Sequence, residues 1–230
     1  MAQNDKIVSN LKSLIAIDGP VAVGKSSAGL LLAKKLGYIF FDTGMMYRAF
    51  TWKVLKLDIP LENKNVLCEL ASKTNFDFVP SEKGNLSFLV DGVDVSSELS
   101  RPEVEENVSL ISKVAGVRQV MVLEQRRLAQ QGGVVMAGRD IGTKVLPWAE
   151  LKIFLVASAE ERATRRYKEL LGRGELANCD IVLAELRRRD EIDSHRSVSP
   201  LKPADDAIII NTEGLSLEEV VDKIYALAVS

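Results

Sequence analysis

The spacing of apolar residues along the chain predicts a layered α/β fold. Continuous apolar runs of strand length are typical of buried parallel strands, and they occupy residues 13–17, 38–41, 134–137, 152–156 and 207–210. Between or after these runs apolar residues recur at helical spacing, over residues 28–36, 45–56, 102–130, 159–171, 180–194 and 217–228. Strands that alternate with helices favour a three-layer fold with a central parallel sheet, in which ligands bind beyond the carboxyl ends of the strands.

One stretch, residues 75–99, breaks this alternation. Phe76 and Phe78 alternate with polar residues, and two further apolar runs flank Asp91-Gly92, a dipeptide typical of tight β-hairpins. The stretch predicts a small antiparallel unit inserted into the α/β core.

A glycine-rich loop follows the first predicted strand and precedes the first predicted helix. It fits the pattern Gly-x-x-x-x-Gly-Lys-Ser with Gly19, Gly24, Lys25 and Ser26. Glycines let backbone N–H groups surround phosphate oxygens, and the helix N-terminus adds partial positive charge. The Lys25 ammonium can reach the β- and γ-phosphates of ATP, and the Ser26 hydroxyl can bind Mg²⁺. The loop therefore predicts a triphosphate site formed by Gly19, Pro20, Val21, Ala22, Val23, Gly24, Lys25, Ser26 and Ser27.

Composition narrows the class of protein further. The chain has 230 residues, of which 47% are hydrophobic and 27% charged, as in ordinary globular proteins. Its net charge of -2 gives no reason to expect nucleic-acid binding. The N-terminal residues carry no apolar signal core, and no apolar run approaches membrane-spanning length. We therefore expect a cytoplasmic protein, a monomer with no membrane partner, in which Cys68 and Cys179 are reduced packing residues.

A second polar cluster begins where the second predicted strand ends. Thr43 and Arg48 can hold a phosphate there, and Tyr47 can pack against a ring or sugar. The alternative is that Thr43 caps the following helix and Tyr47 belongs to the core.

The charged helix near the C-terminal end of the chain offers a further candidate. Arg189, Asp193 and Arg196 are spaced i, i+4 and i+7, so they share one helix face. The alternative is an ordinary salt-bridged solvent face. The connection before this helix, residues 170–180, contains Gly172 and Gly174 and is either a mobile flap or a plain surface loop.

In these motifs the chain resembles the bacterial cytidylate kinases, a family of nucleoside monophosphate kinases. GRDIGT after the third strand, combined with RRRDEIDSHR before the last, is far more specific than the phosphate loop. The matching stretches occur in the family's order, and they are IDGPVAVGKSS, FDTGMMYRA, RPEVEENVS with the VR that ends at Arg118, VMAGRDIGT, KIFLVASAEERATRR and AELRRRDEIDSHRSVSPLKPADDAIIINT.

The resemblance implies transfer of the γ-phosphoryl group of ATP to CMP or dCMP, with Mg²⁺, in pyrimidine nucleotide metabolism. It implies one P-loop kinase domain over residues 1–230, with a monophosphate-binding subdomain at about 43–120, the antiparallel insert at 75–99 and a lid at about 159–180. It places around CMP and the transferred group Thr43, Tyr47, Arg48, Ser109, Arg118, Arg139, Asp140, Arg189, Asp193 and Arg196. The catalytic residues that it implies are Lys25, Arg139, Arg189 and Arg196.

These roles are chemically sensible. The Asp140 carboxylate can accept hydrogen bonds from the cytosine N4 amino group, and Arg139 can clamp phosphate. Ser109 and Arg118 are nine residues apart on one expected helix, so both would project to one side and reach the acceptors of the ring.

The expected lid is rich in arginine. Several arginines that close on the transition state suit its charge, which is spread over the equatorial oxygens. The candidates are Arg162, Arg165, Arg166 and Arg173.

The chain also departs from the family in places. Val21 replaces a small or hydroxyl residue, Thr43 replaces the commoner serine, and Arg101 lies one place from an expected arginine and is left out of the site. His195, the only histidine, is interpreted as a neighbour of functional residues and not as a catalytic base.

Other functions remain open from the residues alone. A kinase of the same class could use UMP, AMP or a small alcohol as acceptor. A GTP-binding switch would share the phosphate loop, but it would carry an Asn-Lys-x-Asp motif that this chain lacks. A nucleic-acid-binding ATPase would need a basic surface, which the net charge of -2 does not suggest.

Overall fold

The computed structural model describes residues 11–80 and 86–230. The chain divides into two compact units, each described here by itself. Unit 1 comprises Met1–Phe41 and Ala129–Ser230, and unit 2 comprises Asp42–Leu128. Part of the N-terminal segment expected to lack a signal core, and residues 81–85 of the expected insert, lie outside the described residues.

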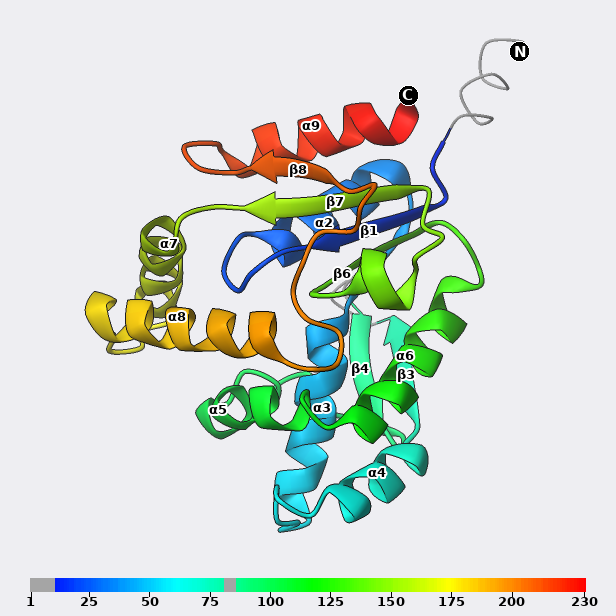
Figure 1. Ribbon diagram of the computed structural model, residues 1–230, viewed down its shortest axis with the longest axis vertical. Coiled ribbons are helices and arrows are strands. Elements are labelled where there is room, and N and C mark those ends of the chain that lie inside the picture. The colour runs from blue at the N-terminus through cyan, green and yellow to red at the C-terminus, as the bar shows by residue number, and fades with distance from the viewer. Residues whose placement is uncertain (1–10, 81–85) are drawn as a thin grey trace. The chain divides into compact units, whose positions relative to one another are not determined.

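Unit 1 is built on a parallel sheet with the strand order β2-β6-β1-β7-β8 (Figure 1). The strands are β1 Leu14–Asp18, β2 Ile39–Asp42, β6 Val134–Gly138, β7 Leu151–Val156 and β8 Ile208–Asn211. Each of the expected apolar runs forms one of these strands, with ends that differ by about one residue. The central strand β1 pairs with both β6 and β7, so the chain that leaves β1 lies between the ends of two neighbours.

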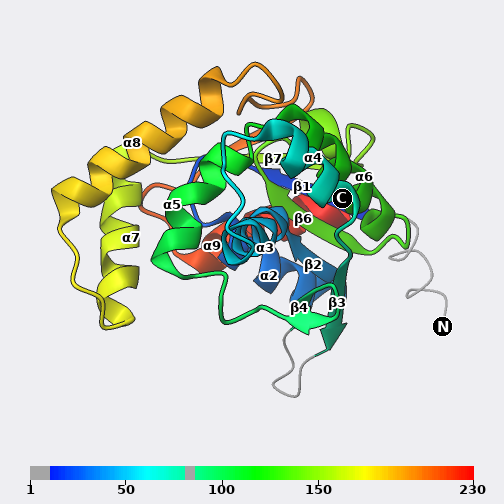
Figure 2. The same ribbon diagram turned by 90° about the horizontal axis from the view of Figure 1, so that it is seen from below.

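Helices flank this sheet. They are α2 Lys25–Leu36, α7 Ala159–Gly172, α8 Cys179–His195, α9 Leu217–Val229 and a short π-helix, η1 Ile141–Val145. Helices α2 and α9 pack together, and their apolar residues share one core with Ile15 and Ile17 of β1. Because side chains alternate along a strand, Ala16 and Asp18 point to the other face of the sheet. Helices α7 and α8 pack against each other and cross at a steep angle (Figure 1 and Figure 2).

Unit 2 combines helices with a small antiparallel sheet. Its elements are α3 Thr43–Lys56, α4 Lys64–Ser72, β3 Phe76–Pro80, β4 Leu86–Val90, β5 Val93–Asp94, α5 Pro102–Ile111 and α6 Ala115–Ala129. The sheet order is β3-β4-β5, which confirms the antiparallel insert. At the predicted hairpin Asp91 and Gly92 have φ values of 51° and 81°, the left-handed conformation that such turns require.

One helix prediction was wrong. Residues 102–130 were expected to form a single helix, but it is interrupted between α5 and α6. The N–H groups of Lys113 and Val114 bond to carbonyls three residues back, at Leu110 and Ile111, so the helix tightens and ends. Ser112, Val114 and Gly116 are weak helix formers that permit this break. Ser109 and Arg118 therefore lie on different helices, and the argument that both project from one helix face does not hold.

No helix in the described part of the chain is both long and apolar enough to cross a membrane. Helix α4 and the π-helix η1 were not anticipated from the sequence pattern.

Candidate functional site

The phosphate loop occupies the connection between β1 and α2. Gly24, at the N-cap of α2, has φ 98°, and Ala22 is also left-handed at φ 59°. These conformations turn the backbone sharply just before the helix begins. The first turn of α2 carries Lys25, Ser26 and Ser27, of which both serines are exposed.

Lys25 is held inside the loop that precedes it. Its side chain is 6% exposed, and its ammonium donates to the Pro20 carbonyl at 2.6 Å. A buried ammonium that lies at a helix N-terminus and is enclosed by its own loop is suited to binding a polyphosphate.

Asp18, the residue directly before this loop, was missed by the sequence analysis. Its carboxylate is buried, and burial raises its pKa to about 6, with the nearby Asp140 charge adding to the rise. Hydrogen bonds from the N–H groups of Gly142 and Ile141, and the charge of Lys25, oppose the rise. The available signal was an acidic residue at the end of a buried apolar strand.

A cluster of alternating charges lies beyond the carboxyl end of β6. Arg139 Nε donates to Asp193 Oδ2 at 2.8 Å. The Arg196 guanidinium lies 3.8 Å from Asp193 Oδ1 and 3.7 Å from Asp140 Oδ1. Asp140, Asp193 and the side chain of Arg196 are nearly inaccessible to solvent. The structure therefore brings together four of the predicted site residues, and we call these four the β6 charge cluster.

Two details of this cluster differ from the helix-face prediction. Arg196 is not helical, because α8 ends at His195 and Arg196 has extended backbone angles. Arg196 Nε donates to the Ser199 carbonyl, which fixes the side chain after the helix has ended. Arg189 bonds to Glu185 at 2.9 Å, an i, i+4 pair of the ordinary kind. The expected common face of Arg189, Asp193 and Arg196 was therefore wrong for Arg196.

Arg162, one of the expected lid arginines, ties α7 to the phosphate loop. It is 5% exposed and donates to the carbonyls of Val21 at 3.0 Å and Ala157 at 3.2 Å. It also pairs with Asp190 of α8 at 2.7 Å. This residue therefore links the phosphate loop, the end of β7, and the helices α7 and α8.

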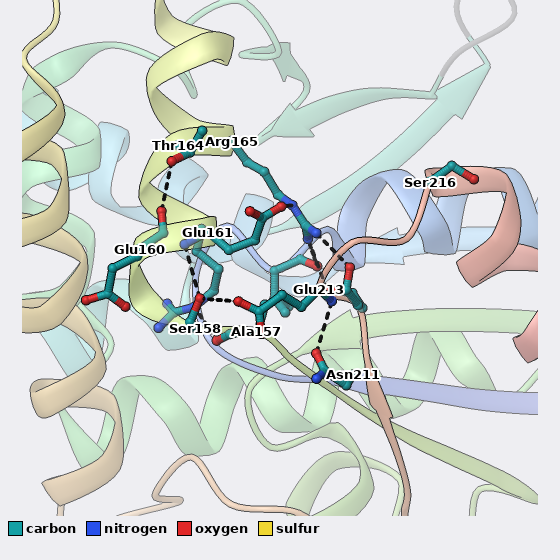
Figure 3. Close-up of polar contacts among 12 residues, drawn as sticks. Ala157, Ser158, Glu160, Glu161, Thr164, Arg165, Asn211, Glu213 and Ser216 are labelled. Carbon is teal, nitrogen blue, oxygen red and sulfur yellow. Dashed lines mark hydrogen bonds and ion pairs between the residues drawn. The ribbon is translucent and has the colours of Figure 1, made fainter.

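Arg165 makes a second connection, at the carboxyl ends of β7 and β8. Figure 3 shows its side chain reaching from α7 toward the segment that follows β8, where it donates to the Thr212 carbonyl at 2.7 Å. In the same view Ser158 donates to Glu213 at 2.6 Å, and Asn211 accepts from the Glu213 N–H at 3.0 Å. The start of α7 is thus bonded to the chain beyond β8.

The other two arginines of the expected lid make local pairs. Arg166 and Arg173 both bond to Glu169. Arg166 is partly buried, whereas Arg173 is exposed.

Unit 2 contains the other predicted acceptor residues. Arg118 is 3% exposed, donates to the Ser112 carbonyl at 3.2 Å and lies 5.4 Å from the centre of the Tyr47 ring. Ser109 lies in α5, and its carbonyl accepts from the Ser112 hydroxyl at 3.1 Å. Arg118 and Tyr47 are therefore brought together, and Ser109 lies beside the residue that Arg118 contacts.

The start of α3 tests the alternative in which Thr43 caps the helix and Tyr47 belongs to the core. Asp42, and not Thr43, caps the helix, since its carboxylate accepts from the Gly44 N–H at 2.9 Å. Thr43 is buried, and Tyr47 is part of the unit 2 core. Arg48 curls back toward the first turn of α3, where its guanidinium nitrogens lie 3.8 Å from the point that a Cβ on Gly44 would occupy.

Both cysteines are free thiols, but only Cys68 packs against other side chains of the core. Cys68 is partly buried beside the unit 2 core, whereas Cys179 is exposed at the start of α8, so the packing prediction was wrong for Cys179.

Comparison with known proteins identifies what the chain is similar to. A family model described as "Cytidylate kinase" matches residues 15–230. A protein of Geobacillus sp. (strain WCH70) named "Cytidylate kinase" is 51% identical over 213 residues, which cover 93% of this chain and 95% of that protein. One of the same name from Bacillus velezensis is 49% identical over 216 residues, which cover 94% and 96%.

Among solved structures, an uncharacterized protein from Eubacterium ventriosum aligns with a TM-score of 0.50 at 12% identity, covering 94% of this chain and 98% of that one. This likeness concerns the fold alone.

Proposed function

Because the chain belongs to the cytidylate kinase family and transfers the γ-phosphoryl group of ATP to CMP or dCMP, we propose how its residues divide that work. Residues 19–27 hold the ATP phosphates. The β6 charge cluster, with Arg189, and the unit 2 residues Thr43, Tyr47, Arg48, Ser109 and Arg118 bind the acceptor nucleotide. The observation that carries this division is that the phosphate loop follows β1 and the charge cluster follows β6, the adjacent parallel strand.

On the donor side, backbone N–H groups of the loop surround the β- and γ-phosphates, and the Lys25 ammonium bridges them. In the structure the Lys25 ammonium donates to the Pro20 carbonyl. Because phosphate oxygens are stronger acceptors for an ammonium than a carbonyl is, bound ATP would replace the Pro20 carbonyl as its partner. Lys25 then opposes the charge that develops during transfer.

On the acceptor side, the Asp140 carboxylate accepts from the cytosine N4 amino group, with Ser109 and Arg118 at the acceptors of the ring. Arg139 and Arg196 bind the CMP phosphate, and Thr43 and Arg48 add contacts to it. Asp193 pairs with Arg139 in the structure and holds that guanidinium in orientation.

The transfer step needs no general base. The attacking oxygen belongs to the CMP phosphate, which is already ionised near neutral pH. In-line positioning, charge neutralisation by Lys25, Arg139, Arg189 and Arg196, and exclusion of water are then sufficient.

We assign the lid to residues 159–180 and the monophosphate-binding subdomain to about 43–120, within one kinase domain. Arg162, which lies in the lid helix α7, bonds both to the phosphate loop and to α8, so occupancy of the loop by ATP has a direct connection to the lid. Closure of these parts excludes water, which would otherwise compete as the acceptor.

Mg²⁺ fits the residues present at the loop. In phosphoryl-transfer sites this ion is held by one or two protein oxygens, by waters and by the phosphates, and the exposed Ser26 hydroxyl at the start of α2 suits that role. Residues 11–80 and 86–230 contain no group of three His, Cys, Asp or Glu side chains that could hold a metal by themselves. When bound, the ion neutralises charge on the β- and γ-phosphates.

We further propose a cytoplasmic, monomeric enzyme that needs no nucleic-acid partner. The net charge of -2 is consistent with small-molecule substrates.

The experiment that tests this function is an ADP-release assay with CMP, dCMP, UMP, AMP and GMP as acceptors. We expect CMP and dCMP to be used well and the other three poorly. Equal use of UMP or AMP would contradict the assignment of the acceptor site.

A further inference from the structure

The Asp18 carboxylate has a position that the proposed function does not use. Asp18 is the last residue of β1, immediately before Gly19, and its side chain lies on the face of the sheet opposite the α2 and α9 core. It is 4% exposed. A carboxylate buried to this degree is stable only when protein donors replace its water.

Those donors come from the segment that follows β6. Asp18 Oδ1 accepts from the Ile141 N–H at 2.8 Å, and Oδ2 accepts from the Gly142 N–H at 2.7 Å. These two residues directly follow the Arg139-Asp140 dipeptide of the β6 charge cluster. In the sheet Asp18 is also in register with Gly138, the residue before that dipeptide. Asp18 therefore holds the chain on both sides of Arg139-Asp140.

The same bonds replace a cap that Asp140 would otherwise supply. Asp140 is the N-cap residue of η1, but its side chain makes no capping hydrogen bond. An N-cap aspartate normally accepts from an N–H group in the first turn of its own helix. Here the carboxylate of Asp18, from the neighbouring strand, does so. The Asp140 carboxylate is thereby not engaged in capping its own helix, and it lies 3.7 Å from Arg196.

Close packing fixes this arrangement. A Cβ added to Gly142 would lie 3.2 Å from Lys152 Cδ and 3.4 Å from Asp18 Oδ2. The Lys152 stem covers Gly142 from β7, while its ammonium pairs with Asp206 at 2.6 Å. A side chain at residue 142 would press on the Lys152 stem and touch the Asp18 carboxylate that accepts from the Gly142 N–H.

We propose that Asp18 is a positioning residue for the acceptor site: by capping η1 from β1, it orients the Arg139-Asp140 turn, which the proposed function places at the CMP nucleotide. The inference rests on the proposed function, because it takes Arg139 and Asp140 as residues that bind CMP. Asp18 itself touches neither substrate in this account.

The test is Asp18→Asn, which keeps size and removes charge. An amide oxygen can accept from one of the two N–H groups, but the amide nitrogen faces the other N–H and repels it. Loss of such a buried, charge-assisted bond should raise the KM for CMP by about tenfold or more and lower the CMP-to-UMP ratio of kcat/KM, while the KM for ATP changes by less than about threefold. The matched control is Asp222→Asn, which removes an exposed carboxylate paired with Lys35 in the same unit; it should change none of these values.

Gly142→Ala is the second variant, because it leaves Asp18 intact and crowds the same hydrogen bond. It should raise the KM for CMP and lower the CMP-to-UMP ratio of kcat/KM, each by a smaller factor than Asp18→Asn does. If Asp18→Asn does not fold, Gly142→Ala alone tests whether Asp18 positions the acceptor site. Unchanged KM for CMP in both variants, or an equal rise in KM for ATP and CMP, would overturn the inference. If the unmodified chain failed to prefer CMP, the proposed function itself would fall; if it prefers CMP and the variants do so equally, only the role of Asp18 falls.

Discussion

At the scale of single residues, the buried ammonium of Lys25 is the proposed contact to the ATP phosphates whose removal has the clearest consequence. We expect Lys25→Ala to lower kcat by about 10²-fold or more with little change in stability. Removal of a single group that stabilises charge in a transition state typically lowers kcat by this factor. Steady-state rates and thermal unfolding measure both effects. Lys35→Ala, which removes an exposed lysine from the same helix, is the control and should leave the rate unchanged. A folded Lys25→Ala protein with normal turnover would exclude the loop from the mechanism.

Asp18 gives a pH dependence of stability with a defined sign. Its pKa is raised from 3.8 to about 6 in the folded protein, so between these values the folded state binds a proton that the unfolded state has lost. The stabilisation from this proton is fully present below pH 3.8 and is lost as the pH rises through about 6.

Asp18→Asn removes that titration. The free energy of unfolding of the unmodified chain, minus that of Asp18→Asn, should therefore fall by on the order of 3 kcal/mol between these pH values and then stay level. Denaturant titrations across the range measure it. A difference that is constant with pH would mean that the carboxyl titrates alike in the folded and unfolded states.

At the scale of elements, α4 and α6 approach closely at one point in unit 2. A Cβ on Gly116 would lie 2.3 Å from the Cys68 sulfur, so Gly116→Ala must displace the Cys68 side chain or one of the two helices. We expect a loss of about 1–3 kcal/mol of stability. Adding Cys68→Ala should restore part of it, which a double-mutant cycle by denaturant unfolding would show. Additive effects of the two substitutions would contradict the close approach.

The lid helices offer a prediction about motion. If residues 159–180 close on the nucleotides, their amide hydrogen exchange should slow when an ATP analogue and CMP are both present, more than with either alone. Residues of α9, which belong to the unit 1 core, provide the internal reference. Identical exchange with and without both ligands would rule out a lid.

Elements also show what the sequence could and could not predict. The strands were predictable because each is a buried apolar run, and the phosphate loop because its glycines and lysine have fixed spacing. The break after α5 was not, since the apolar periodicity continues across Ser112–Val114 while the hydrogen bonds change from four residues to three. Arg196 belongs to the β6 charge cluster although it lies beyond α8, and its Nε donates to the Ser199 carbonyl. Asp18 was missed because its partners are backbone N–H groups more than 120 residues away in sequence.

At the scale of the whole molecule, the proposed ATP-binding loop belongs to unit 1, and the proposed acceptor residues belong partly to unit 1 and partly to unit 2. The proposed readers of the cytosine base are likewise divided, with Asp140 in unit 1 and Ser109 and Arg118 in unit 2. Selectivity for the acceptor base is therefore the property that tests the account as a whole.

The most direct test is the ratio of kcat/KM for CMP over UMP in Asp140→Asn compared with the unmodified chain. In UMP a carbonyl oxygen replaces the N4 amino group and would face the Asp140 carboxylate, so both repulsion and an unpaired buried acceptor oppose UMP. Asparagine presents either a donor or an acceptor at nearly the same size. We predict lower activity with CMP and a ratio that narrows by about tenfold or more. An equal loss with both substrates, which leaves the ratio unchanged, would show that Asp140 only holds Arg196 in place and would contradict the account.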